Sequence, residues 1–397
     1  MRPTVVALLC LLAAAVGAAG VVVAGERGGW LHDGATQTVL VRQPLDRMSV
    51  PSTIIVSKPV LAPGFQPRRI FAERSPGVVT VFSYFGSKSA ESTLDEGSGF
   101  VVSRAGLVLT AAHVITSTAG TPGLATPASA VYVQFGDGDR VKARVVGWDL
   151  YDDVGVLRVN PSTHELVPVP LGSSANVAVG DPVAAIGSPF GNQASLSVGV
   201  VSARRTIPSL TTEYDLFDAI QTDAPINQGN SGGPLLDAGG RAIGVNAQIG
   251  SSSGLGFEGV SFAVPIDAAR RSLSQLLASG QVAYAYAGLK TEDLTPGIAK
   301  RFGYRASRGA LVDVVTAGGP AARAGLRPGT HDVVYAGQEI TIGGDAITAI
   351  DGAPVVNSDD VARLVAERFV PGEVAWFTVE RGRRHLVVSV ELGDRPR

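Results

Sequence analysis

Three residues in separate parts of the chain have the side chains of a nucleophilic hydrolase. His113 lies near the end of the apolar stretch LTAAHV, Asp153 precedes VGVLRV, and Ser231 lies within QGNSGGPLLD. A serine hydroxyl is a poor nucleophile until a base takes its proton, and an imidazole base needs a carboxylate that fixes its tautomer. The order His, Asp, Ser therefore predicts a catalytic triad. Asp149 and Asp152 remain alternative acids, and Asp153 is preferred because it stands directly before a strand.

Glycines surround Ser231, and nucleophilic attack by a serine on a peptide bond requires them there. When serine attacks a peptide carbonyl, backbone amides must hold the negatively charged oxygen that forms, and each donor contributes roughly 10²–10³ in rate. The amides of Gly229 and Ser231 are predicted to form this oxyanion hole. A bulky side chain at Gly229 or Gly232 would obstruct it.

Other functions of glycine-rich stretches do not fit their surroundings here. The G-x-S-x-G pattern of an α/β-hydrolase needs a helix and then a histidine after the serine. Here Pro234 comes three residues after Ser231, where that helix would have to begin. The later histidines, His331 and His385, lie in polar turns. GLGFEG (254–259) lacks the strand and the helix that flank a dinucleotide site. No H-E-x-x-H pattern occurs, so neither a metal site nor a cofactor is predicted.

Composition favours a mainly β protein and gives no indication of a nucleic-acid partner. The 33 Lys and Arg residues against 35 Asp and Glu give a net charge of −2, without the basic surface that nucleic acid requires. Short valine-rich runs separated by Gly, Asp and Pro indicate strands and tight turns. Cys10 is the single cysteine and lies in the N-terminal apolar run. The remaining chain therefore has no disulfide.

The N-terminal region has the features of an export signal. The apolar run from Val5 to Ala24 is long enough to span a membrane, and residues 22–24 could also form a cleavage site. Residues 1–26 are accordingly either a signal peptide or a membrane anchor. Both alternatives place the rest of the chain outside the cytoplasm. Residues 27–70, with scattered Pro and Arg, are predicted to be an extended linker.

Two domains are expected after the linker. Residues 71–282 contain successive short strands and then a helix over PIDAARRSLSQLLASG, with Asp267 near its start and Gly280 at its end. Residues 283–393 mix strands with two short helices. One begins after Thr295, and the other lies in NSDDVARLVAERF.

The first domain resembles a known protease family. LTAAHV, DLYDDVGVLRV, AIGSPFG and TDAPINQGNSGGPLLD are similar to the trypsin-like domain of the HtrA/Deg serine proteases. The resemblance implies a mainly β fold of two six-stranded barrels with the triad in the cleft between them. It also implies that Ser261, Phe262 and Ala263 line the wall of the specificity pocket. The chain departs from the family at Ala111, where asparagine is usual.

The second domain resembles the PDZ domain of the same family. YAGLK stands where the carboxylate-binding loop and groove strand belong, and SDDVARLVAER would be the groove helix. Peptide contacts are therefore expected at Ala287, Gly288 and Leu289, and at Val361 on the helix. Ala287 replaces a large aliphatic residue, and THDVVYAGQEITIGG is longer than the common version. Alternatively, this domain only spaces or couples protomers.

These features predict an extracytoplasmic serine endopeptidase that cleaves unfolded or damaged proteins without a cofactor. Its expected partners are unfolded polypeptides, peptides at the PDZ domain and two further copies of the chain in a homotrimer. Nucleic acid is not expected, and a membrane contact is expected if the N-terminal segment stays uncleaved. The alternative is a peptide-binding chaperone or sensor with latent protease activity. The trimer is expected from the resemblance and from apolar Phe65, Ile70 and Phe71, which lie just ahead of the barrel and lack an obvious core of their own.

Overall fold

The computed structural model describes residues 64–86, 93–117, 125–188, 194–209, 212, 215–227, 229–247 and 259–396. The expected signal or anchor, the linker up to residue 63, and residues 254–258 of GLGFEG lie outside these ranges. Among the described residues, no helix combines the length and apolar character needed to cross a membrane.

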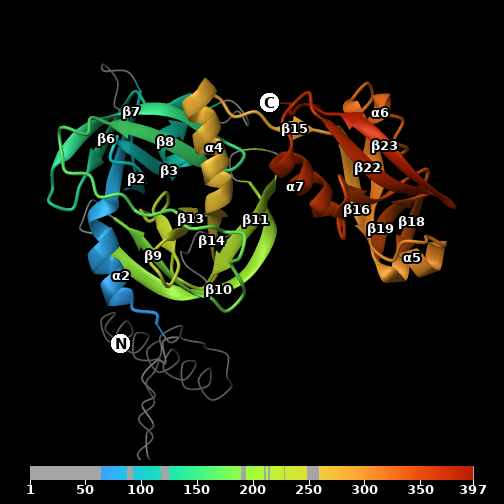
Figure 1. Ribbon diagram of the computed structural model, residues 1–397, viewed down its shortest axis with the longest axis horizontal. Coiled ribbons are helices and arrows are strands. Elements are labelled where there is room, and N and C mark those ends of the chain that lie inside the picture. Colours follow the sequence, from blue (N-terminus) through green and yellow to red (C-terminus); the bar gives the residue numbers. More distant parts are fainter. Residues whose placement is uncertain are drawn as a thin grey trace, which may run out of the picture. The chain divides into compact units, whose positions relative to one another are not determined.

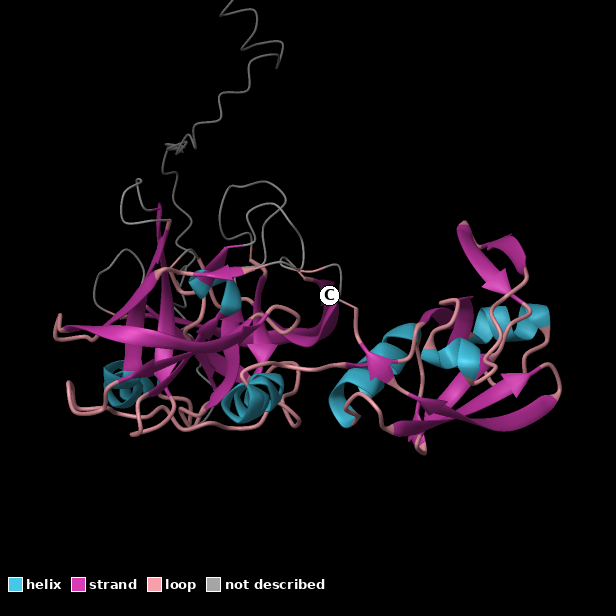
Figure 2. Ribbon diagram, turned by 90° about the horizontal axis from the view of Figure 1, so that it is seen from above, coloured by secondary structure: helices cyan, strands magenta, loops and turns pink. Residues whose placement is uncertain are grey.

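Strands dominate the described chain (Figure 2), and those between residues 78 and 265 form two closed six-stranded barrels (Figure 1). The first barrel has the strand order β1 (Val78–Phe85), β2 (Thr93–Val101), β3 (Leu107–Ala111), β8 (Val154–Val159), β7 (Arg140–Asp149) and β6 (Ala130–Gln134). The second has the order β10 (Ser195–Pro208), β11 (Asp215–Thr222), β14 (Ser261–Pro265), β13 (Ala242–Ala247), β12 (Pro234–Leu236) and β9 (Pro182–Gly187). The short strands β4 (Thr116–Ser117) and β5 (Thr126–Pro127) pair separately. The predicted fold class is confirmed.

Each barrel closes around its own apolar core. Val81 and Leu157 belong to the core of the first barrel, and Ile220 and Leu235 to that of the second. Strand β13 is buried at every position, which explains why its sequence, AIGVNA, shows little polar alternation. A third cluster, which includes Phe100, contains residues of both barrels and joins them.

The segment before the first barrel packs on the barrels of its own chain. Helix α2 (Pro67–Arg74) and the one-turn helix η1 (Ser75–Gly77) lead into β1. Phe65 is 5% exposed and Ile70 is 3% exposed, and both belong to the cluster that joins the barrels, against which Phe71 also packs. The expectation that these residues lack a core within the chain is wrong. They supply no argument for a subunit interface.

Helix α4 (Ile266–Ser279) follows the second barrel and has the ends that the sequence predicts. Asp267 in its first turn accepts hydrogen bonds from Ser173 and Ser174, which fixes the helix start to the segment before β9. The helix ends at Gly280, whose φ of 75° lies in the left-handed region that favours glycine. Its buried face is directed against β13 and β7.

A buried carboxylate connects helix α4 to the turn between β7 and β8. Asp149 Oδ2 accepts hydrogen bonds from Ser272 Oγ at 2.7 Å and from Tyr284 Oη at 2.6 Å. Burial and the nearby charge of Asp152 raise the pKa of Asp149 to about 6, although these hydrogen bonds act in the opposite direction. The contacts hold one end of the turn that carries Asp153.

The chain after helix α4 forms a second β structure. Its main sheet has the order β16 (Leu289–Leu294), β17 (Gly309–Val315), β20 (Ala346–Ile350), β22 (Val374–Arg381) and β23 (Arg384–Glu391), with β21 (Ala353–Pro354) paired to β20. Strands β15 (Ala285–Tyr286) and β24 (Gly393–Asp394) pair with each other. Strand β16 stands at one end of the sheet order, and helix α7 (Ser358–Arg368) packs beside it.

The two helices predicted here are present, and a third short one was not foreseen. Thr295 caps α5 (Pro296–Phe302) by accepting from the amide of Ile298, and Asn357 caps α7 in the same way. Four residues form α6 (Pro320–Arg323), too few to show an apolar period. The long stretch THDVVYAGQEITIGG forms a hairpin of β18 (His331–Tyr335) and β19 (Gln338–Ile342).

Candidate active site

The structure brings His113 and Asp153 into contact. His113 lies on the single turn α3 (Ala112–Ile115), directly after β3, and Asp153 directly precedes β8. The Nδ1 atom of His113 lies 2.7 Å from Oδ2 of Asp153, and the amide of His113 donates to Oδ1 at 3.0 Å. Pairing of β3 with β8 sets Ala111 opposite Val154, so adjacent strand ends hold the two side chains in register.

The backbone of Asp153 is itself unusual. Its φ of 50° lies in the left-handed region, which few residues other than glycine adopt. The two alternative acids on the same turn are directed to other partners. Asp149 accepts from Ser272 and Tyr284, and Asp152 Oδ2 lies 3.6 Å from a guanidinium nitrogen of Arg271. Asp153 is therefore the carboxylate that faces His113.

The electrostatic surroundings raise the pKa of His113. Burial lowers the pKa of His113 and is the largest single influence. The charge and hydrogen bond of Asp153, with a smaller contribution from Asp95, outweigh burial and raise this pKa above its ordinary value. Such a histidine accepts a proton readily, as a general base must.

Ser231 lies on the tight turn between β11 and β12, which two glycines shape. Gly229 has a φ of 93° and Gly232 a φ of 85°. A Cβ atom on Gly232 would also lie 2.2 Å from the carbonyl oxygen of Ser98, so this position tolerates no side chain. Both the conformation and the space therefore require the glycine that the sequence places there.

The Ser231 turn meets the His113 segment at strand β2. A Cβ atom on Gly97 would lie 2.6 Å from a methyl group of Val114 and 3.2 Å from the carbonyl oxygen of Ser231. Likewise, a Cβ atom on Gly232 would lie 2.8 Å from the amide of Ala111. The segment that carries His113 and the turn that carries Ser231 are therefore packed together around Gly97 and Gly232.

The expected specificity residues occupy β14. Ser261 and Ala263 are buried and Phe262 is half-buried. Ser261 Oγ accepts a hydrogen bond from the amide of Ile226 at 3.1 Å, which connects β14 to the segment before the nucleophile turn. Asp223 Oδ1 accepts from the amide of Val200 at 2.7 Å and so braces strand β10.

The expected peptide-contact residues gather at one end of the C-terminal sheet. Ala287 and Gly288 form the connection between β15 and β16, and Gly288 has a φ of 74°. Ala287, Leu289 and Val361 belong to one apolar cluster, in which Val361 is contributed by helix α7. The carbonyl of Ala287 accepts from the amide of Ala321 on α6, which fixes the connection.

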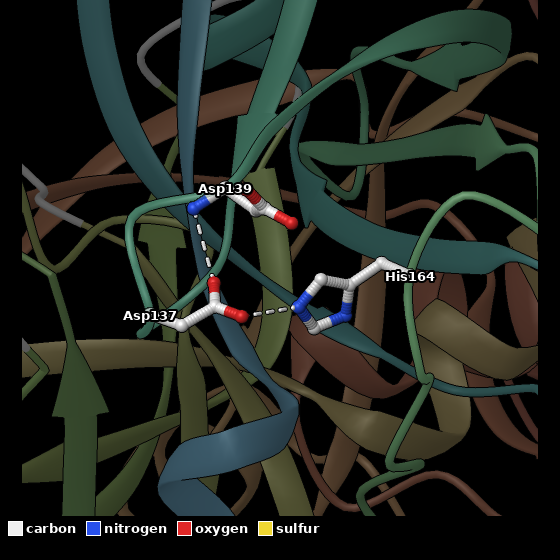
Figure 3. Close-up of side chains that lie close together, drawn as sticks. All are labelled: Asp137, Asp139 and His164. Carbon is white, nitrogen blue, oxygen red and sulfur yellow. Dashed lines mark hydrogen bonds and ion pairs between the residues drawn. The ribbon is translucent and has the colours of Figure 1, made fainter.

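One group of potential metal ligands occurs among the described residues, away from the triad. The ligand atoms of Asp137, Asp139 and His164 lie within 4.8 Å of one another (Figure 3). His164 Nε2 lies 2.9 Å from Asp137 Oδ2, and His164 Nδ1 lies 2.7 Å from the carbonyl oxygen of Glu165. Both ring nitrogens thus face acceptors, and the pKa of His164 is raised despite the opposing effect of partial burial. Hydrogen bonds between the His164 ring, Asp137 and the Glu165 carbonyl account for the close approach of these side chains.

Comparison with known proteins identifies both halves of the chain. Residues 97–245 match the model of the trypsin-like peptidase domain, and residues 286–392 match that of the PDZ domain. Protease Do-like 1 of Arabidopsis thaliana, a chloroplastic protein, is 38% identical over 337 residues, which are 83% of this chain and 72% of that one. The chain belongs to the HtrA family of serine proteases.

Solved structures of HtrA proteins support this assignment. A structure of the HtrA-type protease AlgW with a tripeptide is 32% identical in sequence and has a TM-score of 0.67. The match covers 84% of this HtrA chain and 98% of the AlgW chain. A probable periplasmic serine endoprotease, DegP-like, from Pseudomonas fulva is 37% identical over 301 residues, 76% of this chain and 56% of the relative. The chain thus spans somewhat more than half the length of the DegP-like relatives that it matches.

One residue of this HtrA site was not singled out from the sequence. Ser98, between Gly97 and Gly99 on β2, is fully buried and bonded to the nucleophile turn through its backbone and its side chain. A hydroxyl residue enclosed by two glycines within a strand is the signal that could have indicated it, because glycine in a strand often marks close approach of another backbone.

Proposed function

We propose that this protein is a serine endopeptidase that cleaves unfolded or damaged polypeptides without a cofactor. The observation that carries the proposal is the 2.7 Å contact between His113 Nδ1 and Asp153 Oδ2, beside the turn that holds Ser231. In the reaction, Ser231 Oγ attacks the peptide carbonyl carbon while His113 accepts the hydroxyl proton. His113 then delivers that proton to the departing amine, and water completes the hydrolysis by the same route. Asp153 holds the imidazole in the required tautomer throughout.

The oxyanion would be held by the amides of Gly229 and Ser231. The left-handed φ of Gly229 supports this role, because it allows the turn to aim the amides of Gly229 and Ser231 at one point, while the amide of Asn230 between them donates to Asn227. The proposal also places the protein outside the cytoplasm. The names of its relatives, periplasmic in bacteria and chloroplastic in Arabidopsis, agree with the apolar run at residues 5–24.

The C-terminal domain is proposed to bind a peptide as an added strand. Strand β16 ends the sheet order, and helix α7 packs beside it, which is the arrangement that β-augmentation uses. The backbone of Ala287, Gly288 and Leu289 would receive the peptide's terminal carboxylate, and Val361 would contact its last side chain. Binding of short peptides to full-length protein with Ser231→Ala, measured by fluorescence anisotropy, tests this part separately from hydrolysis.

Cleavage is expected after small or medium aliphatic residues such as Val, Ala or Ile, and not after Lys or Arg. A pocket for a cation needs a carboxylate at its floor, because burial of an unpaired charge is costly. Pro225 occupies the position six residues before Ser231 where trypsin-like enzymes with basic specificity have that acid. Burial of one aliphatic side chain supplies roughly 1.5–3 kcal/mol, enough for a preference but not for strict selection.

Mass spectrometry of a casein digest measures this preference. Asp223→Ala is the informative variant. Asp223 is the acidic residue nearest in sequence to Pro225, and its carboxylate accepts a hydrogen bond from the amide of Val200. Unchanged cleavage positions in the variant agree with a bracing role for Asp223. A majority of cuts after Lys or Arg, lost in Asp223→Ala, would show that the pocket floor has been assigned wrongly.

We also propose a homotrimer assembled through the protease domains. The proposal rests on the family resemblance alone, since Phe65 and Ile70 are buried within their own chain. Light scattering of the full-length protein at micromolar concentration is expected to give three times the monomer mass of 40.7 kDa. A monomer at that concentration contradicts the proposal.

A further inference from the structure

Ser98 is attached to the nucleophile turn by its main chain. It lies in the middle of β2 and is fully buried. Its amide donates to the carbonyl oxygen of Ser231 at 2.8 Å, and its own carbonyl accepts from Thr110 Oγ1 at 2.7 Å. Gly232 lies directly against that carbonyl, at the position where no side chain fits. Strand β2 therefore forms the support on which the turn rests.

The hydroxyl of Ser98 makes a second attachment that a backbone alone could not make. It donates to the carbonyl oxygen of Gly229 and accepts from the amide of Ser188 at 2.8 Å. Ser188 Oγ in turn accepts from Thr80 Oγ1 at 2.5 Å. A hydroxyl has one proton to donate, so the proton of Ser98 is committed to Gly229.

These three buried hydroxyl residues, Thr80, Ser98 and Ser188, form a chain that crosses from one barrel to the other. Thr80 and Ser98 face each other across the pair β1–β2, and Ser188 follows β9 of the second barrel. All three are 5% exposed or less. Water has little access to compete for these hydrogen bonds, so their geometry is held firmly.

The consequence concerns the direction of the backbone amides. A peptide unit is planar, so fixing the carbonyls of Gly229 and Ser231 fixes the planes that carry the amides of Asn230 and Gly232. The oxyanion amides of Gly229 and Ser231 lie on the preceding planes, which are joined to the fixed ones through the φ and ψ angles of Gly229 and Ser231. The φ of 93° at Gly229 then turns its own amide relative to that plane. Glycine can leave this conformation easily, because no side chain opposes rotation. The hydroxyl of Ser98 restrains the carbonyl of Gly229 from one side, and the bond from the amide of Asn230 to the carbonyl oxygen of Asn227 holds the other side of the same peptide plane.

We propose that Ser98 is a positioning residue of the oxyanion hole, which it orients through its hydroxyl bond to Gly229 and its amide bond to Ser231. The proposal rests on the proposed peptidase function. Ser98 touches neither the substrate nor the reacting atoms. Its removal therefore affects stabilisation of the tetrahedral intermediate and leaves substrate binding in place.

The experiment measures kcat and KM of the full-length protein with an internally quenched peptide that carries Val at the cleaved position. For Ser98→Ala, kcat is expected to fall about tenfold to a hundredfold, somewhat less than for outright loss of one oxyanion donor. KM is expected to stay within about twofold, because ground-state binding does not use the oxyanion hole. Affinity for a peptidyl boronic acid, which forms a tetrahedral adduct, should fall in parallel with kcat.

Ser83→Ala is the matched control. Ser83 lies on β1 of the same barrel and is fully buried, but its hydroxyl has no hydrogen-bond partner among the residues that the structure describes. Loss of this hydroxyl is expected to leave kcat unchanged. Ser98→Cys is a second variant of nearly the same volume, and its thiol, a weak donor, is expected to lower kcat less than alanine does. It is the variant measured if Ser98→Ala does not fold.

The outcomes separate the two proposals. Full kcat in Ser98→Ala, or in Ser98→Cys where the alanine variant is unfolded, overturns the positioning role while the peptidase function stands. An increase in KM with unchanged kcat also overturns it. A wild-type protein that hydrolyses no peptide overturns the peptidase function and the positioning role together. The acidic limb of the pH profile of kcat/KM should be the same in Ser98→Ala and wild type, since the variant does not alter His113.

Discussion

Ser231→Ala is expected to abolish proteolysis of casein by the full-length protein, with a loss of about 10⁶-fold in kcat. The reason is chemical. Alanine offers no oxygen to attack the carbonyl, so neither His113 nor the oxyanion hole has an intermediate on which to act. The remaining rate should be that of water attacking a bound and polarised peptide. Quantitation of newly formed amino groups over several hours measures this rate.

The fold should survive this substitution. Ser231 is only 4% exposed, but its side chain is small and its carbonyl bond to Ser98 is made by the backbone. Thermal unfolding of the variant is expected to match wild type within a few degrees, and peptide binding at the PDZ domain should be retained. Persistent casein cleavage by a clean preparation would refute the assignment of Ser231. Peptide binding without any hydrolysis by the wild-type protein would favour the chaperone or sensor function.

Asp153→Asn is expected to lower kcat by about 10⁴-fold with little change in KM. The amide occupies the same space as the carboxylate, but it no longer favours the Nδ1-protonated tautomer that leaves Nε2 free to accept a proton. It also withdraws the negative charge that raises the pKa of His113. Initial rates with the quenched peptide measure both constants.

The pH dependence of kcat/KM in Asp153→Asn provides an independent test of the role of Asp153. A general base must be neutral, so kcat/KM of the wild type falls as pH decreases through the raised pKa of His113. Without the charge of Asp153 this pKa falls, and the acidic limb of the profile should move to lower pH. Asp152→Asn is the control, because Asp152 lies near Arg271 and does not contact His113. A larger loss in Asp152→Asn than in Asp153→Asn would show that the wrong acid has been chosen.

Much of the architecture could be predicted because its signals are local. The ends of α4, α5 and α7 follow from Gly280, Thr295 and Asn357, which satisfy or terminate the helix backbone at short range. Short β-branched runs likewise indicate strands wherever they occur. By contrast, four residues are too few to show a period, so α6 was missed. The hairpin of β18 and β19 appeared in the sequence only as extra length.

Side-chain partners far apart in the sequence could not be derived in the same way. Phe65 and Ile70 appeared to lack a core because much of the cluster in which they lie comes from strands more than a hundred residues later, such as β9. Burial is decided by what packs against a residue, and no local pattern records that. Their lack of a local core in the sequence therefore gave no valid argument for a subunit interface.

The sequence by itself determined which chemistry is available: one His, one Asp and one Ser in a fixed order, with glycines where a backbone must turn sharply. It left Asp149, Asp152 and Asp153 as possible acids. All three are aspartates close together in the chain, and the sequence does not show which side chain points to His113. Only the tertiary structure decided among them. Pairing of β3 with β8 directs Asp153 to His113, while Ser272 and Tyr284 hold Asp149 elsewhere. Hydrogen bonds depend on distance and angle, and these are properties of the assembled barrels.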